Sequence, residues 1–404
     1  MQGSFVKKRG NTWTAYFYVA DLGGKRRQRS KGGFKTKRLA QAWLAETVGS
    51  VQTREFIEKQ KLTVEEYLTG RWLPIMRSSL KPTTFDSYQR LVEWHVLPYL
   101  GELPLQELSA DHLDRLYAHL LEDGRRDGKS GGLSKKTVRS IHNLLHKALR
   151  DAERKRLVSR NVTEAADAPK LPPSGEDMTT WTASELRTFL EAVESHRLYA
   201  ALLLAATTGM RRGEVLGLRW SDIDFQRRRL AVRQTITTAN YRIVVGTPKT
   251  RRGRRSIALD QTTLQVLAAH QERQLEERRL IGAAYSDQGL VFPREDGTPI
   301  NPDLLSQVFD RAVAKLSIPR IRFHDLRHTH ATLGLAAGVP AKVMSERLGH
   351  ATVAFTLDIY THAVPGLDEA SADQMGELIF GTGDSSKPVP IDRKRRMFYN
   401  EELA

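Results

Sequence analysis

The spacing of apolar side chains changes along this chain, and each change limits what that part of the chain can fold into. Near the N-terminus, apolar side chains alternate with polar or basic ones, as is typical of strands. These apolar positions are Phe5, Val6, Trp13, Ala15, Phe17, Val19 and Phe34. From Leu62 the spacing is helical, and over residues 222–259 it returns to a period of two. The pattern therefore predicts an α+β protein of several domains.

Residues 1–60 are predicted to form a small three-stranded sheet backed by one helix. Gly23-Gly24 supplies a turn between two strand-like segments, and residues 36–53 carry the single apolar stripe of a helix. Residues 1–38 hold eleven Lys/Arg and one acid, Asp21. We therefore expect the exposed face of this sheet to be basic, with a merely solvated run of charge as the alternative.

Residues 62–160 are predicted to form a compact bundle of four helices. Capping signals place the helix starts, which are Thr63, Lys81-Pro82, Ser109 and Ser134. The third helix is expected to end at Gly124. The fourth helix gathers one apolar face from Val138, Ile141, Leu144, Leu145, Ala148 and Leu149. The proline-containing residues 161–178 are predicted to be a linker.

Residues 179–380 are predicted to form a third domain, mostly α-helical with a small antiparallel sheet. Thr182 begins its first helix, the strands occupy residues 222–259, and helices resume after Asp260. The tail, residues 381–404, is basic and follows a polar Gly/Ser stretch. It is expected to be disordered or to lie on a neighbouring protomer.

Composition narrows the classes of function that remain. The absence of cysteine excludes disulfides, thiol catalysis and thiolate metal sites, and it favours an intracellular setting. No apolar run is long enough to span a bilayer, and the basic start lacks the apolar core of a secretory signal. The net charge of +16 indicates a polyanionic partner, nucleic acid before a membrane surface.

Four polar motifs lie in the third domain, and two of them pair charged groups at helical spacing. Arg211 and Glu214 are three residues apart at a predicted helix start, so the carboxylate can position the guanidinium. His324 and Arg327 have the same spacing; a guanidinium can grip two phosphate oxygens, and an imidazole can move a proton near neutral pH. Taken singly, each pair could also be an ordinary surface or capping arrangement.

The other two motifs supply a lysine, a histidine and a tyrosine. Lys249 lies in a turn between predicted strands, in a loop that continues with Arg251, Arg252, Arg254 and Arg255. Tyr360 follows His350 by ten residues. A phenol with a pKa of about 10 needs a base or a strongly cationic site to act as a nucleophile.

The histidines also admit a metal site, because five of the twelve lie between residues 324 and 362. However, the chain has no HExxH motif, no cysteine and no carboxylate at a tight spacing to these histidines. We therefore predict neither a metal nor another cofactor. No P-loop sequence is present, so the chemistry is not expected to need ATP.

In order and spacing, the four motifs resemble those of the tyrosine recombinases of the phage-integrase type. The resemblance covers residues 180–365 and is weaker over residues 1–160. It implies that Tyr360 is the nucleophile, that Lys249 is the general acid for the leaving 5′ hydroxyl, and that Glu214 supports Arg211. It also implies that Arg211, Arg327 and His350 bind the phosphate, and that His324 is a catalytic residue able to take or hold a proton.

The same resemblance implies roles for the other segments and for partners. Residues 1–60 would bind arm-type DNA sites, and residues 62–160 would clamp core-type sites together with the catalytic domain. The expected DNA contacts are Lys7, Lys8, Arg9, Trp13, Lys25, Arg26, Arg27, Arg29, Lys31, Arg251, Arg252, Arg254 and Arg255. Four protomers would exchange strands through a four-way junction. The protein would act on DNA in the cytoplasm, with a bacterial host or a prophage or other mobile element as its origin. A directionality factor and a DNA-bending host protein are further candidate partners.

Two other functions remain compatible with the same residues. A type IB topoisomerase uses nearly the same groups, although the basic N-terminal domain and the spacing from His350 to Tyr360 argue against it. A DNA-binding regulator with a silent catalytic domain is the second alternative, although every catalytic position is filled. The favoured function is site-specific integration or excision of DNA through a 3′-phosphotyrosine intermediate.

Overall fold

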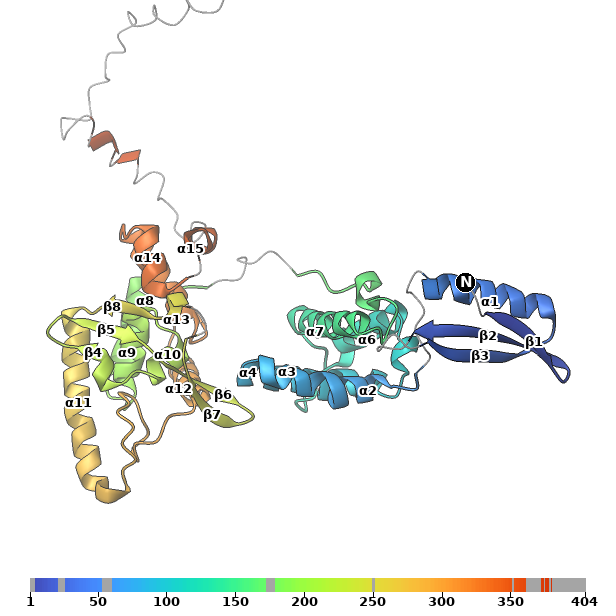
Figure 1. The fold of residues 1–404 in the computed structure, drawn as a ribbon. Helices are drawn as coiled ribbons and strands as arrows, with labels where there is room; N and C mark the ends of the chain where they lie inside the picture. Colours follow the sequence, from blue (N-terminus) through green and yellow to red (C-terminus); the bar gives the residue numbers. More distant parts are fainter. Residues whose placement is uncertain are drawn as a thin grey trace, which may run out of the picture. The chain divides into compact units, whose positions relative to one another are not determined.

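The computed structural model of the protein describes residues 4–20, 26–52, 60–171, 179–248, 251–350 and 352–360, with a few more between residues 372 and 379. Two compact units, residues 1–173 and 174–404, are considered separately (Figure 1). The predicted α+β, multidomain class is confirmed, with small antiparallel sheets among many helices. None of the described helices is both long and apolar enough to cross a membrane.

The N-terminal segment forms the predicted sheet and helix. Strands β1 (Phe5–Arg9), β2 (Thr12–Ala20) and β3 (Arg26–Phe34) are antiparallel in the order β1-β2-β3, and α1 (Lys37–Gln52) lies along one face (Figure 1). The alternation of the sequence explains this arrangement, because Ala15 and Phe17 are buried beneath α1.

The next segment is a helical bundle whose helices begin at the predicted caps. The side chain of Thr63 caps α2 (Val64–Tyr67), which continues through a π-helical turn (Leu68–Trp72) into α3 (Leu73–Ser79). The second helix likewise comprises α4 (Pro82–Leu91), a π-helical turn (Val92–Val96) and α5 (Leu97–Leu100). Ser109 and Ser134 cap α6 (Ala110–Asp123) and α7 (Lys135–Arg154). The predicted apolar face of α7 is buried in this core.

The start of the predicted linker packs on the bundle. A 3-10 turn (Val162–Ala165) lies against α7, where Thr163 Oγ1 is 2.8 Å from Nδ1 of His146. Asn161 and Thr163 are both buried, and the amide of Asn161 donates to the backbone carbonyl of His146. Residues 161–166 therefore extend the bundle, a contact between distant positions that the proline content of the segment could not reveal.

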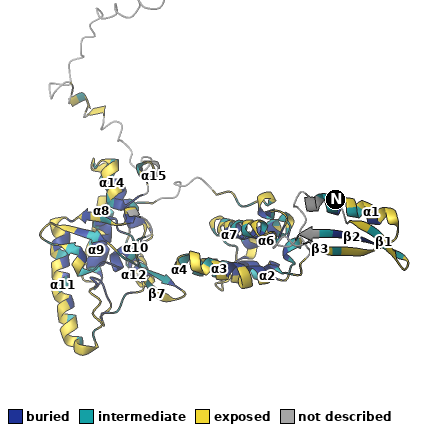
Figure 2. Ribbon diagram, viewed as in Figure 1, coloured by how far each residue is buried: buried dark blue, intermediate teal, exposed yellow. Residues whose placement is uncertain are grey.

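The third predicted domain is built around α9 (Tyr199–Thr208), which is almost wholly buried (Figure 2). Around it lie α8 (Ala183–Ala192), α10 (Arg212–Leu216), α11 (Gln261–Ile281), α12 (Pro302–Val313) and α13 (Asp325–Ala336). Helices α14 (Ala341–Leu348) and α15 (Val353–Tyr360) follow and contact each other. Further 3-10 turns in this domain are Trp220–Asp222, Arg251–Gly253 and Gly282–Ala284, and the helical bundle contains one more at Leu105–Glu107.

The strands predicted over residues 222–259 form two separate sheets. Strands β4 (Ile223–Asp224), β5 (Arg229–Val232) and β8 (Arg255–Ala258) make one, in the order β4-β5-β8. Strands β6 (Thr235–Ala239) and β7 (Arg242–Gly246) make a hairpin of their own. The sheets separate because β5 pairs with β8, whereas β6 packs against α10 and α12.

Candidate active site

Arg211 stands at the start of α10 and is held there by Glu214. The preceding helix, α9, ends at Gly209 in the left-handed conformation (φ +64°). A Cβ at this position would come within 2.5 Å of Leu348 Cδ2, so only glycine fits the turn. The carboxylate of Glu214 accepts from the Arg211 backbone N–H (3.0 Å) and from its guanidinium (2.8 Å). The Arg211 side chain is 43% exposed, so its guanidinium is both fixed and accessible.

Arg255, which the sequence predicts to contact DNA, is buried and bonded inside the domain. Its side chain is only 6% exposed, and Nη2 lies 2.9 Å from the Glu214 carboxylate. Its Nε donates to the backbone carbonyl of Arg347 at the end of α14. Burial alone would raise the pKa of Glu214, but Arg255, with Arg211, holds that pKa below its usual value. Arg255 therefore keeps Glu214 ionised inside the domain.

Arg327 is almost completely buried and joins two other motifs. Nη1 donates to the carbonyl of Gly209 (2.8 Å), and Nη2 donates to the carbonyl of Leu348 (2.7 Å). These bonds connect α13 to the ends of α9 and α14. A guanidinium is planar, so two such bonds fix its orientation.

His324 lies one turn before Arg327, at the N-terminus of α13, and it remains exposed. Its ring meets that of His328 nearly at a right angle, with centroids 5.3 Å apart. Partial burial, followed by the neighbouring His328 and Arg327, lowers the pKa of His324 below its usual value. A neutral imidazole therefore lies beside the arginine cluster.

His350 follows the end of α14 and is buried. Gly349 adopts the left-handed conformation (φ +69°), and the carbonyl of Arg252 approaches too closely to leave room for a Cβ. The imidazole Nδ1 of His350 lies 2.9 Å from Thr356 Oγ1. Burial, together with the cations Arg327 and Arg211, lowers the pKa of His350 to about 3. This histidine is therefore neutral at physiological pH.

Two of the predicted catalytic residues lie partly or wholly outside the described residues. Tyr360 is the last residue of α15, and its side chain lies outside the described residues. All of Lys249 also lies outside them, as do the side chain of Arg251 and the tail 381–404. Arg252 and Arg254 are exposed in the loop that precedes β8.

Arg212, the neighbour of Arg211, turns away from the cluster. Its Nη1 donates to Ser306 Oγ (2.7 Å) and lies 3.0 Å from the carboxylate of Asp303, both on α12. The neighbouring arginines 211 and 212 therefore serve different surfaces, since Arg211 is the extended N-cap residue of α10 and Arg212 is its first helical residue.

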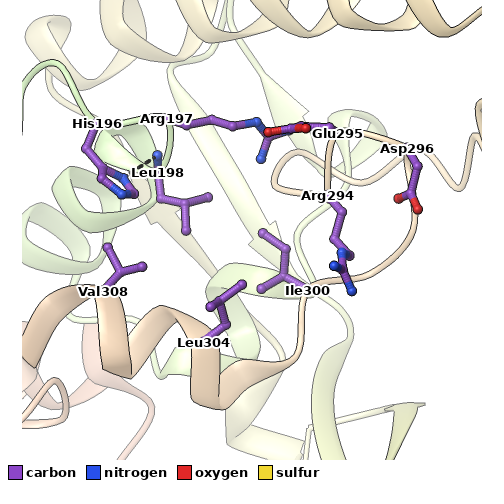
Figure 3. A pocket seen from close by; sticks show the side chains of 9 residues that line it. All are labelled: His196, Arg197, Leu198, Arg294, Glu295, Asp296, Ile300, Leu304 and Val308. Atoms are coloured by element: carbon purple, nitrogen blue, oxygen red, sulfur yellow. Dashed lines mark hydrogen bonds between the residues drawn. The ribbon is translucent and has the colours of Figure 1, made fainter. Parts of the chain in front are cut away.

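A cavity of about 450 Å³ lies elsewhere in the third predicted domain (Figure 3). Its apolar walls include Leu198, Ile300 and Val308, and Arg294 and Asp296 line its rim. None of the predicted catalytic residues lines it.

Two basic side chains of β1 lie on the face of the N-terminal sheet that α1 leaves open. Lys7 pairs with Thr14 and Arg9 pairs with Thr12, out of phase with the residues buried under α1. Both cations are exposed. Lys25 lies outside the described residues, as does the side chain of Arg26.

Other cations predicted to contact DNA share the face that α1 covers. They are Lys8, Arg27, Arg29 and Lys31. The Nζ of Lys31 lies 4.7 Å from the ring centroid of Trp43 on α1. Trp13 is half-buried on this same face. Trp13 and Lys31, both expected to contact DNA, therefore pack on the helix side of the sheet.

Sequence reasoning missed three groups that complete the cluster: Arg255 as the inner partner of Glu214, His328 beside His324, and Thr356 beside His350. His328 was visible in the sequence four residues after His324, and Thr356 precedes Tyr360 by one helical turn. For Arg255 no signal existed, because its neighbours in the loop are equally basic.

Family models match three successive parts of the chain. The Phage integrase family model matches residues 179–365. An Arm DNA-binding domain model matches residues 4–50, and a Phage integrase N-terminal SAM-like domain model matches residues 63–121. The fold and the site together define a DNA strand-exchange enzyme of the tyrosine recombinase class. The chain belongs to the phage integrase family of tyrosine recombinases, and it is a site-specific DNA recombinase.

Two curated relatives extend over most of the chain. A "Tyrosine recombinase XerC-like" protein of Caldanaerobacter subterraneus is 28% identical over 366 residues, which cover 85% of this chain and 90% of the relative. The ICEBs1 integrase of Bacillus subtilis is 28% identical over 301 residues, covering 74% and 79%. These relatives favour a recombinase over the topoisomerase and silent-regulator alternatives.

Solved structures agree in fold. The Tn1549 transposon integrase in complex with transposon right end DNA has a TM-score of 0.63 at 21% identity, covering 78% of this chain and 99% of that one. A lambda integrase tetramer bound to a Holliday junction has a TM-score of 0.53 at 20% identity, covering 85% and 92%.

Proposed function

We propose that this chain integrates or excises a mobile element by cleaving and rejoining DNA through a phosphotyrosine at Tyr360. One observation carries the proposal. The buried guanidinium of Arg327 bonds the carbonyls of Gly209 and Leu348, and so gathers three motifs that lie far apart in the sequence. The gathered groups are Arg211, His324, Arg327 and His350, two cations and two imidazoles around one site.

These groups suit a phosphodiester as the reacting group. Negative charge on its non-bridging oxygens increases in the pentavalent transition state, and fixed cations stabilise that charge without reorganising. Arg211 is the accessible cation, and Glu214 with Arg255 holds it in place. The neutral imidazoles can donate a hydrogen bond to the same oxygens.

The reaction then follows in two steps. The Tyr360 oxygen attacks phosphorus and gives its proton to the neutral imidazole of His324. The bond from phosphorus to the 5′ oxygen breaks, and a 3′-phosphotyrosine forms. Lys249 gives a proton to the leaving 5′ oxygen. Attack by the 5′ hydroxyl of a second strand reverses these steps, so the bond energy is conserved and no nucleotide is consumed.

The domains bind different types of DNA site. The open face of the N-terminal sheet, with Lys7 and Arg9, binds arm-type sites, since the major groove admits a β-ribbon as well as a helix. The bundle and the catalytic domain bind core-type sites, and four protomers exchange strands through a junction on DNA in a bacterial cell. The lambda integrase tetramer on a Holliday junction, similar in fold, supports this assembly.

A nicked suicide substrate tests the chemistry directly. Cleavage near a nick releases a short fragment, which prevents rejoining and traps the covalent adduct. We expect wild-type protein to form the adduct and Tyr360→Phe to form none. Tyr285→Phe, which removes a hydroxyl bonded to Gln274 elsewhere in the domain, is the matched control and should cleave normally. An adduct with Tyr360→Phe would show that another residue is the nucleophile.

The division of DNA sites is tested by deleting residues 1–60. We expect the shortened protein to cleave core-site DNA at the normal rate and to lose arm-site binding. Equal loss of both activities would contradict separate roles for the domains.

A further inference from the structure

Thr356 lies outside the four motifs, yet it bonds one of their histidines. Its Oγ1 is 2.9 Å from Nδ1 of His350, and both side chains are buried, Thr356 completely and His350 to 6% exposure. A second contact holds the same segment, because the buried Ser345 donates from Oγ to the carbonyl of Thr352. The start of α15 is thereby attached to the end of α14.

The hydrogen bond decides which imidazole nitrogen carries the proton. A neutral histidine has one donor and one acceptor nitrogen, whereas a hydroxyl can act as either. To donate to a phosphate oxygen in the proposed reaction, His350 needs its proton on Nε2. Nδ1 must then accept, and the hydroxyl of Thr356 is the group placed to donate to it.

The same bond acts on the helix that ends at the nucleophile. Thr356 precedes Tyr360 by four residues on α15, a rise of about 6 Å along the helix axis. Fixing Thr356 against His350 therefore fixes the position of α15 relative to the phosphate-binding groups.

We propose that Thr356 is a positioning residue that selects the Nε2–H form of His350 and couples this histidine to the nucleophile helix. The inference rests on the proposed function of Tyr360 and His350. Mere occupancy of a buried space by Thr356 is the competing explanation, and it predicts different behaviour for valine and serine.

Two substitutions separate positioning from space-filling. Thr356→Val keeps the shape and removes the hydroxyl, whereas Thr356→Ser keeps the hydroxyl and removes a methyl group. Single-turnover formation of the phosphotyrosine adduct should slow roughly 10- to 100-fold in Thr356→Val, the scale typical of groups that orient a functional histidine. Thr356→Ser should recover most of this rate, and the Kd for core-site DNA should change by less than about twofold in either variant.

A double-mutant cycle tests whether Thr356 acts through His350. If it does, the variant combining Thr356→Val with His350→Asn will be no slower than His350→Asn alone. Within the described residues, the buried hydroxyl of Thr332 on α13 has no hydrogen-bond partner. Thr332→Val is thus the matched control and should cleave at the wild-type rate.

Three results would overturn the inference while leaving the proposed function intact: a wild-type rate in Thr356→Val, an equally slow Thr356→Ser, or additive losses in the cycle. In each of these cases Tyr360→Phe still forms no adduct. A wild-type protein that forms no adduct would instead overturn the proposed function, and the inference with it.

Discussion

The N-terminal sheet and the catalytic domain hold their positive charge in opposite ways. In the sheet, Lys7, Lys8 and Arg9 are exposed along a short strand. In the catalytic domain, Arg255 and Arg327 are buried, and their donors meet backbone carbonyls or the carboxylate of Glu214. The first arrangement supplies charge density, and the second supplies charge at fixed positions.

This difference indicates what each region responds to. Exposed cations act by displacing counterions from DNA, so their effects are small, nearly equal and dependent on salt. Fixed cations act through geometry, so one substitution can abolish the effect and salt matters less. The regions also differ in histidine content. The N-terminal sheet has no histidine, because the first one in the chain is His95, whereas the catalytic domain contains buried histidines.

The largest effect is expected at the fixed cation Arg327. Arg327→Lys keeps the charge but loses the planar fork whose two nitrogens donate to Gly209 and Leu348, so the gathered motifs should separate. We expect adduct formation to fall about 10³-fold or more on a suicide substrate. Arg212→Lys is the matched control, because this arginine bonds α12 instead, and it should lose little activity. Similar losses in both variants would mean that the bonds of Arg327 to Gly209 and Leu348 have no special role.

The buried ion pair behind Arg211 should contribute mainly to stability. Glu214→Gln preserves the side-chain shape and leaves Arg255 buried without its carboxylate. The free energy of unfolding of the catalytic domain should fall by about 3 kcal/mol, as measured by urea unfolding. The exposed pair of Glu276 with Arg279 provides the comparison, and Glu276→Gln should change stability by less than about 1 kcal/mol. Equal effects would mean that burial does not matter here.

The sequence predicted best where structure depends on neighbours in the chain. Ser109 and Gly124 bound α6 as expected, because a capping hydroxyl and a helix stop act within one turn. The spacing of Arg211 and Glu214 likewise predicted their contact. These signals need no knowledge of the tertiary fold.

The sequence did not predict the direction of a side chain where a distant contact or one extra residue in a strand determines it. Regular alternation from Phe34 would place Lys31 on the opposite face of β3. An irregularity at Gly32 and Gly33 brings both side chains to the α1 side instead. Arg255 turns inward because Glu214, 41 positions earlier in the chain, lies beneath the start of β8. Neither event leaves a mark in the local pattern.

The stability of the catalytic domain should depend on pH through a buried histidine, whereas the N-terminal sheet has no histidine. His270 is buried, and Nε2 lies 2.7 Å from the carbonyl of Val291; burial lowers its pKa to about 4. Because the unfolded chain binds a proton near pH 6.5 and the folded one does not, stability is complete above pH 6.5 and declines toward pH 4. This histidine should account for a loss of about 3 kcal/mol by pH 4, similar to that at Glu214.

His270→Gln tests this assignment, because glutamine can still donate to Val291 but does not titrate. Urea unfolding at several pH values, followed by hydrogen exchange in α11, should show a shallower pH dependence in the variant. Hydrogen exchange in β2, normalised for the intrinsic rate, serves as the internal control, since residues 1–60 contain no histidine. An unchanged slope in α11 would mean that other groups carry the pH response.

The smallest effect is expected in the sheet, where it distinguishes the two faces. Lys7 and Lys8 are adjacent, equally charged and both exposed, but Lys7 lies on the open face and Lys8 on the α1 side. Lys7→Ala should weaken arm-site binding by about 1 kcal/mol or less and reduce the slope of log K against log salt by about one unit. Lys8→Ala should leave both nearly unchanged. Equal changes in the two variants would mean that the sheet binds by overall charge, whereas a change confined to Lys8→Ala would place DNA on the helix side.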